Sequence, residues 1–149
     1  MNKKLLIIAL LLVLALLFHN RKEFLDWYHL TFRCEIEYYE NDEIKVIACK
    51  KNGLVEVVES YSDGNIKQIY YLDFSNRLQG RYTEFYRSGQ PMKVYHYLDG
   101  EKDSIAIGYS ENGLREIEEV YVGDSVKSRV IYHYDTLDSI DYIERFDFN

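Results

Sequence analysis

One short phrase, a tyrosine followed by a polar turn and then an apolar residue, occurs five times along this chain. The tyrosines of successive copies are 22, 25, 23 and 25 residues apart. A regular spacing of this size is typical of repeat proteins, in which neighbouring units bury one another. The five copies are Tyr39–Ile44, Tyr61–Ile66, Tyr86–Met92, Tyr109–Leu114 and Tyr134–Ile140.

Each copy fits the end of one β-strand, a turn and the start of the next strand. Further turn signals, such as Asn52-Gly53 and Asp99-Gly100, lie between the copies, and these residue types tolerate the positive φ of tight hairpins. Counting turns predicts an all-β fold, an antiparallel meander of about ten strands in five hairpin repeats. We expect an elongated twisted sheet, because translational repeats contact only their neighbours. The same meander closed into an open barrel is the alternative.

The composition favours β-strands and argues against nucleic acid as a partner. The chain has 15 tyrosines and a single proline, which favours strands. Residues 31–149 carry 14 basic and 23 acidic side chains, a net charge of −9. Nucleic-acid phosphates would repel such a domain, so we expect no nucleic-acid partner.

The N-terminal segment is apolar and predicts a hydrophobic helix. Lys3 and Lys4 precede the unbroken apolar run Leu5–Phe18, in the order typical of a secretory signal. The small residues of a cleavage site are missing, because the run ends in Leu16, Leu17 and Phe18. This favours an uncleaved signal-anchor that crosses the membrane through residues 5–18, with cleaved export and a buried soluble helix as alternatives.

The chain therefore divides into two parts. Residues 1–33 are expected to form a signal-anchor or signal peptide with a juxtamembrane segment, and residues 34–149 a β-hairpin repeat domain. Basic residues near the N-terminus favour an inside orientation for that end. The repeat domain is then expected in the cell envelope, either anchored to the inner membrane and facing outward or exported after cleavage.

Cys34 and Cys49 are the only cysteines. A two-residue turn at Asn41-Asp42 would place them opposite each other, whereas a three-residue turn would place Cys34 opposite Ala48. Export would permit a disulfide between them. Two reduced, buried thiols are the alternative.

The repeated tyrosines have two interpretations. Aligned on one face, they would stack as same-face neighbours and contribute only packing. They could also form a partner-binding face, since large rings bury much area while their hydroxyls stay hydrated. The residues of this possible face are Tyr39, Tyr61, Tyr86, Tyr109 and Tyr134.

Other polar residues give weaker signals. His96 and His133 each lie between two tyrosines and lack a second ligand at metal-binding spacing. An acidic group, Asp99, Glu101, Asp103, Glu116, Glu118, Glu119 and Asp124, includes only a faint calcium-loop pattern. No phosphate-binding loop or nucleophile motif is present. We therefore expect no metal, no cofactor and no catalytic residues.

The turn phrase resembles the bacterial variant of the MORN repeat, most closely at Tyr38-Tyr-Glu-Asn-Asp42 and Tyr109-Ser-Glu-Asn-Gly113. The resemblance covers residues 38 to about 140 and implies successive β-hairpins. Asp42 and Leu137 replace the glycine of the pattern, and many of its lysines are replaced. Members of that group are often labelled antitoxins of toxin–antitoxin pairs, and others are envelope repeat proteins.

These features predict a non-enzymatic scaffold of the bacterial envelope that binds a protein partner. The alternative implied by the resemblance is an antitoxin or immunity-type protein that neutralises a toxin. A degradative envelope enzyme is a third hypothesis, of a different class.

Overall fold

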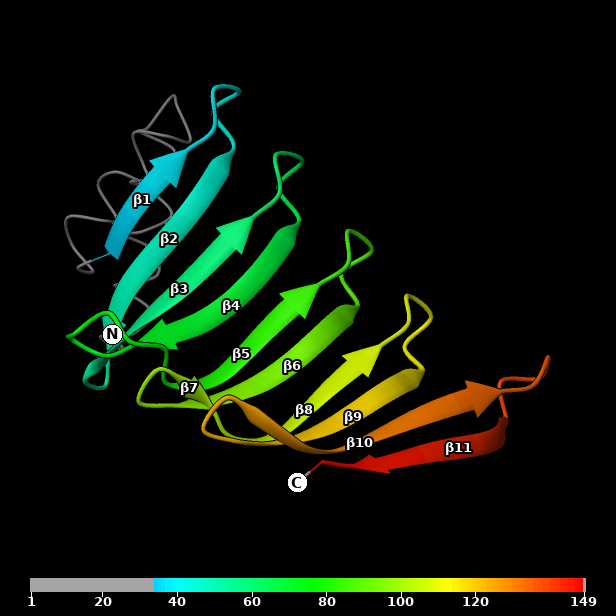
Figure 1. Ribbon diagram of the computed structural model, residues 1–149. Helices are drawn as coiled ribbons and strands as arrows, with labels where there is room; N and C mark the ends of the chain where they lie inside the picture. The colour runs from blue at the N-terminus through cyan, green and yellow to red at the C-terminus, as the bar shows by residue number, and fades with distance from the viewer. Residues whose placement is uncertain (1–33, 149) are drawn as a thin grey trace, which may run out of the picture.

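The computed structural model describes residues 34–148, which form one open, twisted antiparallel sheet (Figure 1). The predicted N-terminal helix and the signal segment, residues 1–33, lie outside the described residues. Within the described part, no helix is long and apolar enough to span a membrane. The strands are β1 (Cys34–Tyr38), β2 (Ile44–Lys51), β3 (Leu54–Ser60), β4 (Ile66–Leu72), β5 (Gly80–Phe85), β6 (Pro91–Leu98), β7 (Glu101–Lys102), β8 (Ser104–Tyr109), β9 (Arg115–Val122), β10 (Ser125–Tyr134) and β11 (Ile140–Asp147).

The strands follow one another across the sheet in chain order, so the topology is a meander. The two-residue strand β7 is the exception, because it pairs only with the end of β6 and lies off the main path. It makes the observed number of strands 11, against the ten expected. Strands β1 and β11 lie at opposite edges and do not pair with each other, so the sheet stays open and the barrel alternative is wrong (Figure 1).

Five hairpin turns of one design lie in a row at the same end of the strands (Figure 1). In each, five residues separate the last pair of opposed strand residues, as between Tyr38 and Ile44 or between Ser60 and Ile66. The first turn residue receives a backbone hydrogen bond from the fourth, and its own amide donates to the carbonyl of the fifth. The fourth residue has positive φ in every copy: Asp42, Gly64, Gly89, Gly113 and Asp138.

The structural repeat is offset by one residue in its last two copies. Tyr39, Tyr61 and Tyr86 hold the first turn position, whereas Ser110 and Asp135 hold it in the fourth and fifth turns. Tyr109 and Tyr134, which the sequence aligned with the first three tyrosines, instead end strands β8 and β10. A sixth turn of the same geometry, Asp73–Arg77, follows β4 at the opposite end of the strands.

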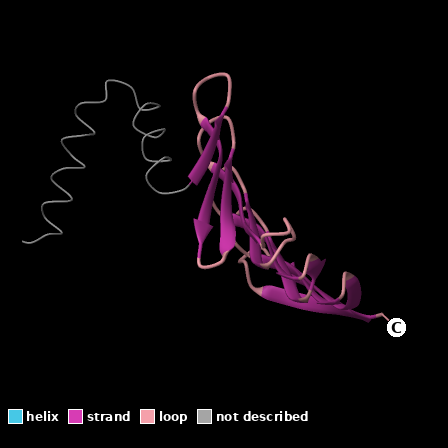
Figure 2. Cartoon of the chain, turned by 90° about the vertical axis from the view of Figure 1, so that its left-hand side faces the viewer, coloured by secondary structure: helices cyan, strands magenta, loops and turns pink. Residues whose placement is uncertain are grey.

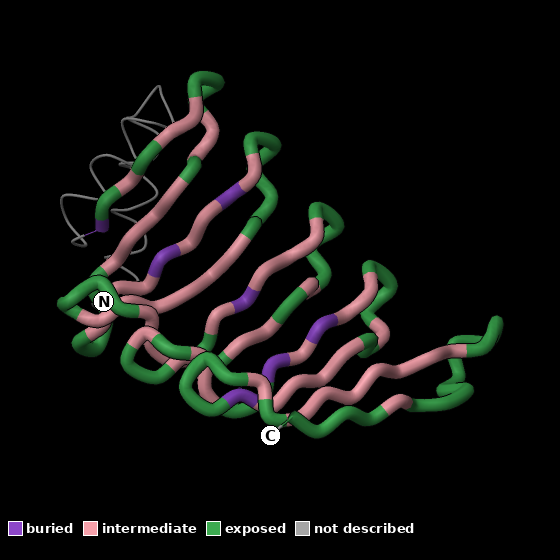
Figure 3. Tube along the Cα trace, viewed as in Figure 1, coloured by how far each residue is buried: buried purple, intermediate pink, exposed green. Residues whose placement is uncertain are grey.

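The sheet is a single layer, so its side chains are buried mainly by neighbours on the same face (Figures 2 and 3). The buried hydrophobic residues among those described are Cys34, Val57, Ala106 and Tyr121, and no described side chain is less than 2% exposed. Most strand residues are half-buried. Stability therefore depends on cross-strand pairs rather than on a closed core.

Candidate functional site

The first three turn tyrosines connect consecutive hairpins. Each hydroxyl donates a hydrogen bond to the main-chain carbonyl of the residue that ends the next turn's incoming strand. These bonds run from Tyr39 to Ser60 (2.8 Å), from Tyr61 to Phe85 (3.0 Å) and from Tyr86 to Tyr109 (2.7 Å). The turn tyrosines thus connect each hairpin turn to the next hairpin along the row of turns.

The series of links changes direction after the third hairpin. Ser110 replaces tyrosine at the first position of the fourth turn, and its hydroxyl is bonded within the turn, to the amide of Leu114. Tyr134 donates backward, to the carbonyl of Arg115 at 2.6 Å. The ring–ring contacts of the described residues involve other aromatic side chains. Equivalent turn tyrosines are two strands apart, about 9.5 Å, which is too far for direct stacking.

A second set of tyrosines lies in the middle of the sheet, on one of its two faces. Tyr82 on β5 is directly opposite Tyr95 on β6, so their side chains share a face. Tyr97 is two residues along β6 from Tyr95 and therefore lies on the same face. Tyr70 on β4 stacks on Tyr82, with ring centroids 5.5 Å apart. The spacing of the tyrosines in the sequence did not predict this set.

Tyr121 on β9 extends the cluster across the sheet. Lys102 connects the two parts, since its ammonium lies 4.5 Å from the ring centroid of Tyr95 and 5.2 Å from that of Tyr121. Such cation–π contacts are favourable. We call the surface formed by Tyr70, Tyr82, Tyr95, Tyr97 and Tyr121 the tyrosine face.

Carboxylates and an amide hold the phenol hydroxyls of this face. Tyr70 donates to Glu59 (2.9 Å), Tyr82 to Gln68 (2.6 Å) and Tyr121 to Glu119 (2.8 Å). Burial, followed by the hydrogen bond and charge of Glu59, raises the pKa of Tyr70 to about 12. Burial and Glu119 likewise raise the pKa of Tyr121 to about 12. These phenols therefore stay neutral hydrogen-bond donors at physiological pH.

A shallow hollow of about 160 Å³ lies beside Tyr95 on this face. Its lining includes the small residues Ala106 and Gly108 and the charged residues Lys93 and Glu119. A Cβ atom at position 108 would come within 2.5 Å of Ile117 Cγ2, so glycine leaves the space that the β9 side chain needs.

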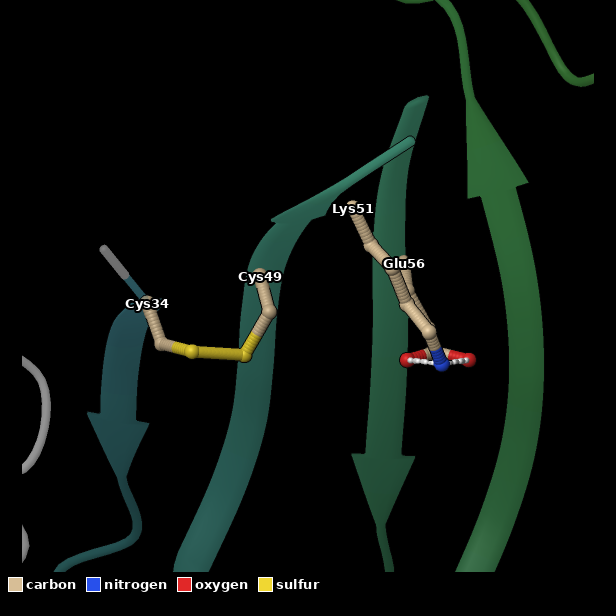
Figure 4. The surroundings of a disulfide bond; sticks show 4 residues. All are labelled: Cys34, Cys49, Lys51 and Glu56. Carbon is tan, nitrogen blue, oxygen red and sulfur yellow. Dashed lines mark hydrogen bonds and ion pairs between the residues drawn. A yellow bond between two sulfur atoms is a disulfide. The ribbon is translucent and has the colours of Figure 1, made fainter. Parts of the chain in front are cut away.

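The cysteines lie at the N-terminal end of the sheet, on the face opposite the tyrosine face. Cys34 on β1 is directly opposite Cys49 on β2, and the structure joins them by a disulfide with Cα atoms 4.1 Å apart (Figure 4). Next in the same row, Glu56 contacts Lys51 at 3.2 Å and accepts a hydrogen bond from Tyr71. The Tyr71 bond, opposed by burial and assisted by Lys51, lowers the pKa of Glu56.

The two histidines lie apart. His96 is exposed on β6, on the face opposite the tyrosine face. His133 on β10 stacks on Tyr142, with ring centroids 4.1 Å apart, and its Nε2 lies 3.0 Å from Glu144 Oε1. Strands β8 and β9 separate the two histidine-bearing strands.

The acidic residues between Asp99 and Asp124 are spread over both faces and the loops, and several of them contact cations or amides. Glu118 pairs with Arg115, and Glu119 with Arg129. Asp99 lies 3.2 Å from Arg77, and Asp124 accepts a hydrogen bond from the amide of Lys102. In residues 34–148 no group of three or more potential ligand residues is arranged to hold a metal ion.

Comparisons with known proteins give no family. No protein-family model and no curated protein matches the chain. Among solved structures, the crystal structure of accessory secretory protein 1, 2 and 3 in Streptococcus pneumoniae is similar over 66% of this chain and 18% of that chain, at 18% identity and a TM-score of 0.43. A GtfA/B complex bound to UDP and GlcNAc is similar over 76% of this chain and 24% of that chain, at 17% identity and a TM-score of 0.44. The chain spans less than a quarter of the length of both.

Proposed function

We propose that this chain is a non-enzymatic scaffold of the bacterial cell envelope, and that a protein partner binds across its tyrosine face. The observation that carries this proposal is the gathering of five half-buried or buried tyrosines on one face of a single-layer sheet. No second layer of the described residues covers that face. Tyrosine rings supply large, rigid contact areas and are enriched in protein interfaces.

The hollow beside Tyr95 supports an anchoring role for this face. Interfaces obtain most of their binding energy from a few side chains that insert into well-packed pockets. The hollow could receive one apolar side chain of the partner, with the exposed Lys93 beside it.

Charge favours a basic partner. Residues 34–148 carry 13 basic and 23 acidic side chains, a net charge of −10. This field would accelerate association with a positively charged protein and would repel nucleic acid. In this proposal the apolar run 5–18 places the scaffold at the membrane, with the sheet outside the cytoplasm. A toxin-neutralising role, the alternative that the MORN resemblance implies, would require a toxin as the partner.

Photo-crosslinking in native membranes tests the proposal, with a photoreactive residue replacing Lys93 in one variant and His96 in the other. Both positions are exposed on β6, but Lys93 lies on the tyrosine face and His96 on the opposite face. We expect a protein adduct from the Lys93 position that the His96 position does not give. Equal capture at both positions, or capture only at His96, would refute binding across the tyrosine face. The identity of the captured protein would distinguish a toxin from an envelope component.

A further inference from the structure

A second hollow, of about 290 Å³, lies on the face of the sheet opposite the tyrosine face. It extends over β4, β5 and the start of β6, which are consecutive strands (Figure 1). Arg81 and Thr83 alternate with Tyr82 along β5, which places them on this opposite face. The residues that line the hollow are Ile69, Tyr71, Arg81, Thr83, Phe85 and Pro91.

Arg81 supplies the positive charge of this hollow, and among the described residues that line it no other is charged. Its side chain is exposed and makes no hydrogen bond or ion pair within residues 34–148. The residue directly opposite it on β6 is His96 rather than a carboxylate. Beside it, the Tyr71 hydroxyl already donates to Glu56 at 2.7 Å. The guanidinium of Arg81 therefore keeps its donors for an anion that enters the hollow.

Thr83 provides a second donor in the same hollow. It is only 6% exposed, yet its hydroxyl makes no hydrogen bond within the part of the chain that the structure describes. Buried polar groups nearly always have a partner, so this hydroxyl is an exception that a ligand oxygen would satisfy. Arg81 and Thr83 are two residues apart on one face of β5, about 6.8 Å along the strand. One carboxylate held between them can accept from both.

The rest of the hollow is mainly apolar. Ile69 lies directly opposite Thr83 on β4, and Phe85 and Pro91 line the part of the hollow that is farther along β5 from Arg81. A ligand that matches this lining has an anionic group at one end and an apolar body at the other. One guanidinium in a domain of net charge −10 favours a single negative charge over two.

We propose that this hollow binds a small monocarboxylic acid with an apolar body. The carboxylate accepts hydrogen bonds from the Arg81 guanidinium and the Thr83 hydroxyl, and the body packs on the apolar part of the lining. The site is separate from the proposed partner surface, because the two lie on opposite faces of the sheet. Each can therefore be tested without the other.

Titration of the full chain in detergent with 3-phenylpropionate, followed by amide NMR spectra, tests the site. We expect the largest shift changes at Ile69, Thr83 and Phe85, with Ala106 on the tyrosine face unaffected. The neutral probe 3-phenylpropanamide has the same body and should bind at least about tenfold more weakly, because it lacks the charge-assisted bond. No binding of the acid, equal affinity for the two probes, or shift changes centred on Ala106 would each overturn the proposal.

Substitution of Arg81 tests the source of the charge preference. Arg81→Gln should weaken binding of the acid at least about tenfold and leave binding of the amide unchanged. Arg81→Lys keeps the charge without the planar fork, so its loss should be smaller. Lys93→Gln is the matched control, since Lys93 is an exposed cation of the neighbouring strand on the tyrosine face. Equal losses in Arg81→Gln and Lys93→Gln would mean that only the net charge of the domain matters, and would refute the site.

Thr83→Val separates binding from folding. The change removes the hydroxyl and nearly keeps the shape, so binding of the acid should weaken several-fold, while Thr83→Ser should keep most of the affinity. The free energy of unfolding, from urea denaturation, should stay the same or rise in Thr83→Val, because the hydroxyl has no partner in the fold to lose. Unchanged affinity of Thr83→Val for the acid would refute the bridging carboxylate.

Discussion

At the scale of single residues, one type of side chain has two different roles in this protein. The turn tyrosines use their hydroxyls to connect neighbouring hairpins, whereas four tyrosines of the tyrosine face contact one another through their rings and Tyr121 joins them through Lys102. The difference follows from position: the turn tyrosines lie in hairpin turns two strands apart, whereas the tyrosines in ring contact lie on the adjacent strands β4, β5 and β6. Composition alone, 15 tyrosines in the chain, does not separate these roles.

Replacing one linking hydroxyl should cost a measurable part of the stability. Tyr61→Phe keeps the ring and removes the donor to the Phe85 carbonyl, so we expect a loss of about 1 kcal/mol in the free energy of unfolding. Urea denaturation followed by circular dichroism gives this value. Tyr109→Phe is the matched control, because no hydrogen bond of the Tyr109 hydroxyl is found among residues 34–148, and it should change stability by less than about 0.5 kcal/mol. Equal losses in the two variants would show that the hydroxyl bond contributes nothing specific.

The raised phenol pKa values predict how stability depends on alkaline pH. The pKa of Tyr70 is about 12 in the fold against an ordinary value of 10, so the unfolded chain loses this proton first. The contribution of Tyr70 is complete below pH 10 and is lost as pH rises through 12. Glu59→Gln removes the charge that helps raise this pKa. A spectrophotometric phenolate titration should then show Tyr70 ionising at lower pH, with Tyr121 unchanged as the internal control.

At the scale of elements, the turn is the unit that repeats most faithfully. Its fourth residue is glycine in three of the five hairpins and aspartate in two, and φ is positive in all of them. The turn geometry thus tolerates aspartate at this position, at Asp42 and at Asp138; the one-residue offset of the fifth turn puts Asp138, rather than the expected Leu137, in the place of the glycine. Aspartate is among the few non-glycine residues that adopt this conformation readily.

An alanine at this turn position should strain the backbone without a steric clash. Gly89 has a φ of +86°, and a Cβ there would have no neighbour within 4 Å. We therefore expect Gly89→Ala to destabilise the protein by about 1 kcal/mol through backbone conformation alone. Thermal unfolding of this variant beside Ser88→Ala, an exposed change at the preceding turn residue, isolates the effect. A neutral Gly89→Ala would mean that this turn relaxes into another conformation.

The hairpins could be predicted from the sequence, but their exact register and the tyrosine face could not. Strand alternation and turn residues place each connection locally. The first turn position, however, depends on the β-bulge beside each turn, such as the register shift at Tyr38, which adds one residue to the count. A one-residue shift moves every side chain of a strand to the other face. The spacing of residues in the sequence therefore could not predict that Tyr95 on β6 lies opposite Tyr82 on β5.

At the scale of the whole molecule, the sheet is a one-dimensional array in which each strand contacts its two neighbours. Local stability then varies along the array, and an edge can open without the centre. The two edges are unequal. The β1 edge is closed by the disulfide between residues 15 apart, whereas the β11 edge has no such cross-link in the described residues. A cross-link over this separation is worth roughly 3 kcal/mol in the chain-entropy picture.

Hydrogen exchange should detect this inequality strand by strand. In the wild type, amides of β1 and β2 should exchange more slowly than those of β10 and β11, because the disulfide holds β1 and β2 together and restricts their separation. In the Cys34→Ser/Cys49→Ser variant we expect protection to fall in β1 and β2 and to stay the same from β5 to β9, since nearest-neighbour coupling confines the loss. Mass spectrometry of peptides from each strand resolves the profile. A uniform loss of protection over all strands would instead mean that the sheet unfolds as one cooperative unit. The disulfide at the β1 edge would then stabilise the tyrosine face as well.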